Sequence, residues 1–233
     1  MQFKLILPIL LALAAGVRVQ AQQSTQPSPQ STNGQQAVTN DDAGRAFIIR
    51  REEQGLCGVA NQGRTVISEP QQHSIFLGSG WATAAMRKRE PELGNLLANV
   101  SDQAQISALD GCGIKNLFGA TSSQERLDKF TSNQTISDLE IQAVLASMVK
   151  LGPLQRPNAN SIYVLYLDSE LRSTLGTMIA GKHFAAYHNF FNASGVKIHY
   201  VVVPFESDSK AANQIALRAF VAAALNPTGA DSN

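Results

Sequence analysis

The sequence has almost no excess of charge of either sign. Its 233 residues contain 19 Lys and Arg against 18 Asp and Glu, which gives a formal net charge of +1. A protein that binds nucleic acid through its phosphate groups normally carries a basic surplus concentrated on one surface. The composition therefore predicts no nucleic-acid partner.

Long apolar runs are also lacking, apart from one at the N terminus. Lys4 supplies a positive charge, residues 5–17 are almost entirely apolar, and Val19 and Ala21 are the small residues of a cleavage point. This pattern is typical of a secretory signal peptide. The run is shorter than the roughly 20 apolar residues of a membrane-spanning helix. We predict a signal peptide at residues 1–21 and a secreted, extracellular protein (periplasmic if the host is bacterial), with no transmembrane segment after signal removal.

Residues 22–44 contain few apolar side chains and many Gln, Ser, Thr, Asn and Pro residues. Such a segment cannot bury enough apolar surface to offset the entropy of ordering its backbone. We expect a disordered linker at 22–44, a single globular domain at 45–228 and a disordered tail at 229–233. The domain is long enough to enclose a substantial hydrophobic core.

Cysteine is scarce, with only Cys57 and Cys112 in the chain. In an oxidising compartment two cysteines most simply form one disulfide bond, and a reactive thiol is the alternative. Three Asn-x-Ser/Thr sequons begin at Asn99, Asn133 and Asn192. They are candidate glycosylation sites in a eukaryotic host.

Apolar periodicity and capping residues predict a mixture of strands and helices. Buried strands are expected at 74–81, 161–168, 184–191 and 197–205. A capping box at Ser137 and Glu140 begins a helix that ends at Gly152-Pro153, and the last helix is expected at 208–225. Because both faces of the strands are apolar, helices should cover both. We predict an α+β fold with α/β-like layers, in which a mixed sheet with a C-terminal β-hairpin is flanked by helices.

Three of the four histidines lie in or beside the predicted hairpin. If residues 192–195 form its loop, His188 lies opposite His199 on one face of the sheet. Zinc takes three or four ligands, and the hairpin contains no Asp, Glu or Cys that would complete such a set. We predict buried, hydrogen-bonded histidines and no metal site. The alternative is a residual metal-binding protein that uses His183, His188 or His199.

Several segments together resemble the secreted phosphate-induced, EXORDIUM-like family. GRTVISEPQQHSIFLGSGW (63–81) and LGNLLANV (93–100) are similar to the family's opening strand and helix. LDGCGIKNLFGA (109–120) and ISDLEIQAVLASMVKLGPL (136–154) are similar to its middle section, and IYVLYLD and AAYHNFF followed by IHYVVVPF resemble its late strands. The resemblance covers about residues 55–228.

The resemblance implies a helix with a His-Glu-x-x-Glu motif shortly before Asn-Pro, similar to the zinc helix of metallopeptidases. Counted back from Asn226-Pro227, the three motif positions hold Arg218, Ala219 and Ala222. The metal ligand and the base that such chemistry needs are therefore both replaced. By analogy, the resemblance also implies the upper half of a zincin-like fold.

The biochemical activity of the EXORDIUM-like family is not established, although its plant members are associated with the cell wall. We therefore expect a secreted, non-catalytic domain with a degenerate metallopeptidase-like helix and no cofactor, which binds an unknown extracellular or cell-wall ligand. The alternative is a secreted hydrolase with Ser79 as nucleophile, His188 as base and Asp168 orienting the histidine. Ser79 follows one predicted strand in a Gly-Ser-Gly turn and Asp168 ends another, where functional groups often lie.

Overall fold

The computed structural model describes residues 46–51, 57, 65–96, 100, 103–116, 122–127, 130, 134–152, 154, 156–193 and 195–228. All of them belong to one compact unit. The segments predicted as signal peptide (1–21), linker (22–44) and tail (229–233) lie outside the described residues.

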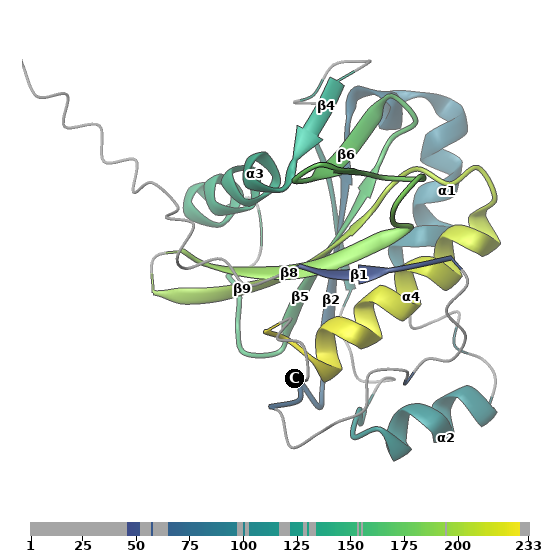
Figure 1. The fold of residues 1–233 in the computed structure, drawn as a ribbon, viewed down its shortest axis with the longest axis vertical. Helices are drawn as coiled ribbons and strands as arrows, with labels where there is room; N and C mark the ends of the chain where they lie inside the picture. The colour runs from purple at the N-terminus through teal and green to yellow at the C-terminus, as the bar shows by residue number, and fades with distance from the viewer. Residues whose placement is uncertain are drawn as a thin grey trace, which may run out of the picture. The chain divides into compact units, whose positions relative to one another are not determined.

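The centre of the fold is a six-stranded mixed sheet with the order β1-β8-β9-β5-β2-β3 (Figure 1). The strands are β1 (Phe47–Ile49), β2 (Gln71–Leu77), β3 (Ser122–Leu127), β5 (Ser161–Leu167), β8 (Ala186–Ala193) and β9 (Val196–Val203). β9, β5, β2 and β3 are parallel, while β8 runs antiparallel to β9 and β1 antiparallel to β8. The predicted hairpin therefore extends a parallel sheet, and the N-terminal strand β1 extends the hairpin.

A smaller sheet and four α-helices complete the described part of the chain. The smaller sheet has the order β4-β6-β7, with β4 at Gln134–Ser137, β6 at Leu171–Leu175 and β7 at Met178–Ile179. The helices are α1 (Ala84–Gly94), α2 (Gln103–Gly111), α3 (Asp138–Leu151) and α4 (Ser209–Leu225). A 3-10 turn at Ser79–Ala82 precedes α1. This architecture confirms a mixed α+β fold in which a C-terminal hairpin is flanked by helices. None of the helices in the described residues is long and apolar enough to cross a membrane.

Two separate hydrophobic clusters lie on the two faces of the large sheet. One cluster joins the sheet to α1, α2 and α4, and the other joins it to α3 and the smaller sheet. The central strands are buried on both faces, which explains why β5 reads as a continuous apolar run. The prediction that both faces are covered is therefore confirmed.

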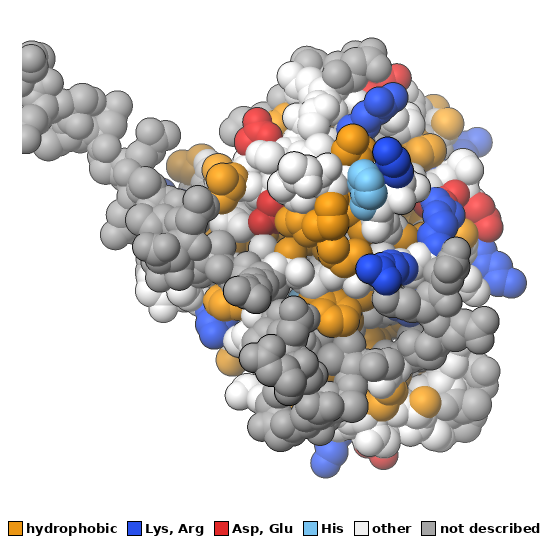
Figure 2. Space-filling model, in the orientation of Figure 1, with side chains coloured by type: hydrophobic (Ala, Val, Ile, Leu, Met, Phe, Trp, Pro, Cys, Tyr) orange, Lys and Arg blue, Asp and Glu red, His pale blue; other side chains and the backbone are white. Residues whose placement is uncertain are grey.

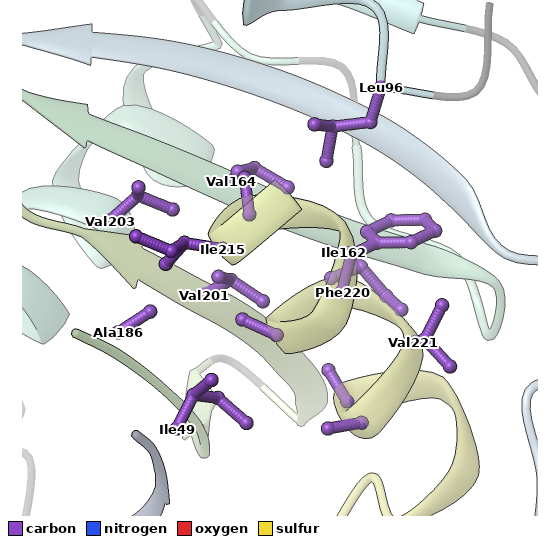
Figure 3. Close-up of a cluster of buried hydrophobic side chains, with 14 of the residues drawn as sticks. Ile49, Leu96, Ile162, Val164, Ala186, Val201, Val203, Ile215, Phe220 and Val221 are labelled. Atoms are coloured by element: carbon purple, nitrogen blue, oxygen red, sulfur yellow. The ribbon is translucent and has the colours of Figure 1, made fainter. Parts of the chain in front are cut away.

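Helix α4 packs tightly because much of its buried surface is alanine. Its larger side chains, Ile215, Phe220 and Val221, lie beside Ile162 and Val164 of β5 in the same cluster (Figure 3). Small side chains let helix and sheet approach closely, and six buried alanines do this here: Ala212, Ala216, Ala219, Ala222, Ala223 and Ala224.

The helix ends predicted from capping residues are confirmed for α3 and α4. The Ser137 side chain accepts a hydrogen bond from the Glu140 N–H, and the Glu140 carboxylate accepts one from the Ser137 N–H. These bonds lower the pKa of Glu140. Gly152 ends α3 in a left-handed conformation, with φ of 83°.

The predicted register of the hairpin is wrong by two residues. Phe190, not His188, lies opposite His199, and Ala193 pairs with Val196. The connection is thus shorter than the expected four residues, with Gly195 in a left-handed conformation at φ 77°. Because a shift of two preserves the alternation of side chains, the predicted faces of the two strands still hold.

Candidate functional site

Ser79 and Asp168 lie at the carboxyl ends of the neighbouring parallel strands β2 and β5. The Asp168 carboxylate is buried and accepts hydrogen bonds from the backbone N–H groups of Gly80 (2.6 Å) and Glu170 (2.9 Å). After β2 the chain passes to the face of the sheet that α4 covers, where Leu93 packs. After β5 it passes to the opposite face, which α3 covers and where Leu171 packs. In open α/β sheets, such a divergence marks the crevice where ligands bind. Here the chain's own carboxylate occupies it.

The Gly-Ser-Gly turn after β2 is shaped around that carboxylate. Gly78 has φ of 121°, and a Cβ atom at this position would lie 2.3 Å from Asp168 Oδ2. A Cβ at Gly80 would lie 2.8 Å from the same oxygen. Both glycines therefore allow the close approach of backbone to carboxylate, and the backbone conformation of Gly78 also favours glycine.

The structure does not bring His188 to Ser79 and Asp168. Across the sheet, His188 lies level with Val201, Val164 and Ser74 in successive strands. Three strand spacings separate β8 from β2, which is about 14 Å, and Ser79 lies further on beyond the end of β2. The catalytic arrangement of Ser79, His188 and Asp168 predicted as the alternative is therefore not assembled.

His188 and His199 are core side chains on the face that α4 covers. The His188 ring is 1% exposed and stacks on Phe47, with 5.1 Å between ring centroids. His199 is also buried, and its Nδ1 lies 3.0 Å from the Pro227 carbonyl oxygen. Burial, with a smaller contribution from His199, lowers the pKa of His188 to about 3, and burial lowers the pKa of His199 to about 4. Both rings are therefore neutral at pH 7. The predicted burial is confirmed for both histidines and the predicted hydrogen bond for His199, whereas the buried Nε2 of His188 has no hydrogen-bond partner among the described residues.

The third histidine of this region has a different position. His183 is exposed, and its Nδ1 accepts a hydrogen bond of 2.9 Å from the Ile179 backbone N–H. It thus closes the turn between β7 and β8 and does not join His188 and His199. Among the described residues, no three His, Cys, Asp or Glu side chains are grouped to hold a metal ion.

Acid is expected to destabilise the protein through His188. Because its pKa is lowered in the folded state, the unfolded chain binds the proton more readily, and stability is lost as pH falls from about 6.5 toward about 3. For this group alone the loss between pH 7 and pH 5 is about 2 kcal/mol. Denaturant titrations at both pH values measure it. In the control variant His188→Phe the pH-dependent loss should be smaller by that amount, and an equal loss in both proteins would contradict the assignment.

The three helix positions that the resemblance assigns to a metal motif take part in packing. Ala219 and Ala222 are 0% and 3% exposed and belong to the apolar cluster around α4. Arg218 is partly buried, and its Nη1 donates a hydrogen bond of 3.4 Å to the backbone carbonyl of Arg51, just after β1. The helix therefore uses these three positions for the core and for contact with the N-terminal segment.

A shallow hollow lies at the carboxyl ends of β5 and β9. Its lining includes Trp81, Tyr166, Val203 and Phe205. Arg89 of α1 lies over the Phe205 ring at 5.2 Å and donates a 2.5 Å hydrogen bond to the backbone carbonyl of Glu206. On the face seen in Figure 2, Lys and Arg side chains gather on the side where α1 and α4 lie, beside a central apolar patch.

A partly buried polar network on the opposite face was not predicted from the sequence. Asp138, in the first turn of α3, accepts hydrogen bonds from Tyr200 (2.6 Å), Gln142 (2.9 Å) and Asn189 (3.0 Å). Burial and the nearby Asp138 carboxylate raise the pKa of Tyr187 well above its usual value. The network fixes the start of α3 against the hairpin. The sequence feature that could have predicted this network is the pair of tyrosines on one apolar face of the hairpin. A buried tyrosine hydroxyl needs a hydrogen-bond partner.

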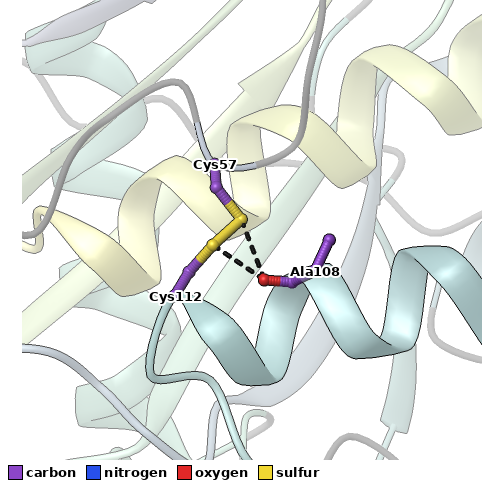
Figure 4. Close-up of a disulfide and its surroundings, with 3 residues drawn as sticks. All are labelled: Cys57, Ala108 and Cys112. Carbon is purple, nitrogen blue, oxygen red and sulfur yellow. Dashed lines mark hydrogen bonds between the residues drawn. A yellow bond between two sulfur atoms is a disulfide. The ribbon is translucent and has the colours of Figure 1, made fainter.

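Cys57 and Cys112 are placed as a disulfide requires. Their Cα atoms are 6.2 Å apart, and both sulfur atoms lie near the Ala108 carbonyl oxygen of α2 (Figure 4). The arrangement is compatible with the predicted disulfide bond. Of the three sequons, Asn192 lies exposed in β8, while Asn99 and Asn133 lie outside the described residues.

Comparison with known proteins adds no relative. No protein-family model matches the chain, and neither the curated proteins nor the solved structures include a significant match.

Proposed function

We propose that this chain is an exported, non-catalytic, EXORDIUM-like domain that binds an extracellular ligand. The observation that carries the proposal is the use of the degenerate helix positions: Ala219 and Ala222 lie in the core, and Arg218 contacts the Arg51 carbonyl. Arginine has no available lone pair for a metal ion, and alanine supplies neither ligand nor base. In this interpretation helix α4 has kept its structural role in the fold and has lost the metal site.

By analogy with the resemblance, the proposal includes a distant relationship to zincin-like folds. A strand, helices, further strands, a hairpin and a long final helix follow one another in the order that the resemblance implies. The antiparallel strand β8 lies between the parallel strands and β1, and α4 packs against β8, β9 and β5. Because fold does not determine activity, the proposed function rests on the helix positions and not on this likeness.

Elemental analysis of the purified protein tests the proposal. After equilibration with zinc chloride and removal of free metal, the protein should retain no stoichiometric zinc. It should also leave a casein-type peptidase substrate intact. Retention of one zinc ion per chain would contradict the proposal. The variant Arg218→Ala is the matched control, and its zinc content should not differ from that of the natural chain.

A fluorophosphonate probe tests the alternative hydrolase. Folded protein should show no covalent adduct on Ser79, because His188, the base of the alternative, lies three strands away from β2. The Ser79→Ala variant gives the background labelling. An adduct found in the natural chain and missing in this variant would favour a serine hydrolase over the binding domain.

A further inference from the structure

The outer edge of the large sheet is covered by a very short strand from the N-terminal segment. β1 pairs with only three residues of the eight-residue strand β8: Phe47 with His188, Ile48 with Tyr187 and Ile49 with Ala186. A three-residue edge strand makes few ladder hydrogen bonds, so its local unfolding costs much less than global unfolding. The edge that it covers is a ready template for another strand.

Alternate residues of this segment make distinct contacts with the domain. The Phe47 ring stacks on His188, and Ile49 is 3% exposed within the apolar cluster, beside Ala186 (Figure 3). Two residues further on, Arg51 Nη2 lies 2.6 Å from Glu206 Oε2. The edge of β8 with Glu206, which we call the β8 socket, therefore recognises the pattern aromatic-x-isoleucine-x-arginine.

The chain that follows β1 is attached to the domain independently of β1. Cys57 follows β1 by eight residues and is placed for a disulfide with Cys112 at the end of α2. This link holds the chain downstream of β1 to the domain. β1 can therefore leave the β8 socket while the rest of the sheet stays intact.

We propose that the β8 socket binds, in trans, an extended polypeptide of the pattern aromatic-x-isoleucine-x-arginine, added as an antiparallel strand in place of β1. This inference rests on the proposed binding function and names its partner class. The occupant is a polypeptide because the free edge offers alternating backbone N–H and C=O groups, which only another strand matches in register. The charge of the partner is set by Glu206, whose pKa is lowered by Arg51 despite partial burial. In the absence of a partner, β1 occupies the socket and competes with it.

A labelled peptide tests the proposal on the full chain. The probe is a fluorescein-labelled peptide with the sequence of residues 46–51, AFIIRR. The variant Ile49→Asp places a charge in an apolar site and should displace β1 from the β8 socket. It should therefore bind the probe at least about ten-fold more tightly than the natural chain does. Fluorescence anisotropy measures the binding. The variant Leu151→Asp, at an exposed position of α3, is the matched control and should bind like the natural chain.

A charge exchange tests the specificity of the β8 socket. In the Ile49→Asp background, Glu206→Arg should weaken binding of AFIIRR. A peptide in which the residue equivalent to Arg51 is glutamate should restore it. A peptide with aspartate at the position of Ile49 should not bind any variant. Cooperative thermal unfolding shows that each variant is folded. If the Ile49→Asp variant does not fold, the milder substitution Ile49→Ala takes its place.

The outcomes separate this inference from the proposed function. Failure of the folded, unseated variant to bind AFIIRR overturns the inference. A natural-chain dimer that dissociates in the Ile49→Asp variant would show β1 of a second copy bound in trans at the β8 socket and would support the inference. If the peptide binds and mass spectrometry then finds it cleaved, the non-catalytic function fails while the β8 socket stands.

Discussion

Replacing Gly78 by alanine is expected to destabilise the protein by about 4 kcal/mol, among the largest effects of a single substitution. The new Cβ would lie 2.3 Å from Asp168 Oδ2, and φ at this residue is 121°. The Asp168 carboxylate cannot move away freely, since two backbone N–H groups hold it in a buried site. Strained backbone and steric overlap therefore add. Chemical denaturation of the purified variant measures the loss.

Gly176→Ala provides the matched control for this prediction. Gly176 also has a positive φ, of 60°, but a Cβ at this position meets nothing within 4 Å. Only the left-handed backbone then opposes the substitution, at a cost of roughly 1–2 kcal/mol. If the two variants lose the same stability, the Asp168 carboxylate is not the cause. In the double variant Gly78→Ala/Asp168→Ala, part of the loss should be recovered because the overlap is removed.

Removing the cysteine pair is the second change with a large expected effect. The variant Cys57→Ser/Cys112→Ser should lose about 4 kcal/mol in the chain-entropy model. The two residues are 55 positions apart, so the disulfide restricts a long loop of the unfolded chain. Urea denaturation of the variant and of the natural chain measures the difference. Adding a reductant to the natural chain should reproduce most of it.

Thiol titration controls for the alternative of a free cysteine. The denatured natural chain, kept without reductant, should react with no equivalent of a thiol reagent. Two reactive thiols in this assay would contradict the disulfide, and the serine variant would then show little change in stability.

Some parts of the fold that local sequence determines were predicted correctly. The capping box at Ser137 and the end of α4 at Asn226 depend on side chains within a few residues of the helix ends. The strands at 161–168 and in the hairpin were evident because long apolar runs need burial on both faces. By contrast, β1, β3 and the smaller sheet were not predicted. Their sequences are short or polar, and their positions depend on partner strands far along the chain.

The candidate sites, like the fold, were predicted only where neighbouring residues determine them. Burial of His188 and His199 followed from the apolar residues around them, but their relative position depended on the length of one turn. The role of Asp168 could not be predicted from β5 alone, because its partners belong to the turn after β2. The Asp138 network joins α3 to both hairpin strands, and no spacing in the sequence reports such a contact.

The Cys57–Cys112 pair also has a mechanical consequence. If the chain is pulled from its two ends, β1 is peeled first, because it lies outside the covalent ring and pairs at the sheet edge. The ring itself contains β2, α1 and α2 and cannot lengthen while the disulfide is intact. The 55 positions between the cysteines correspond to roughly 200 Å of extended chain withheld from stretching. A force-extension trace should therefore gain about that length when reductant is added.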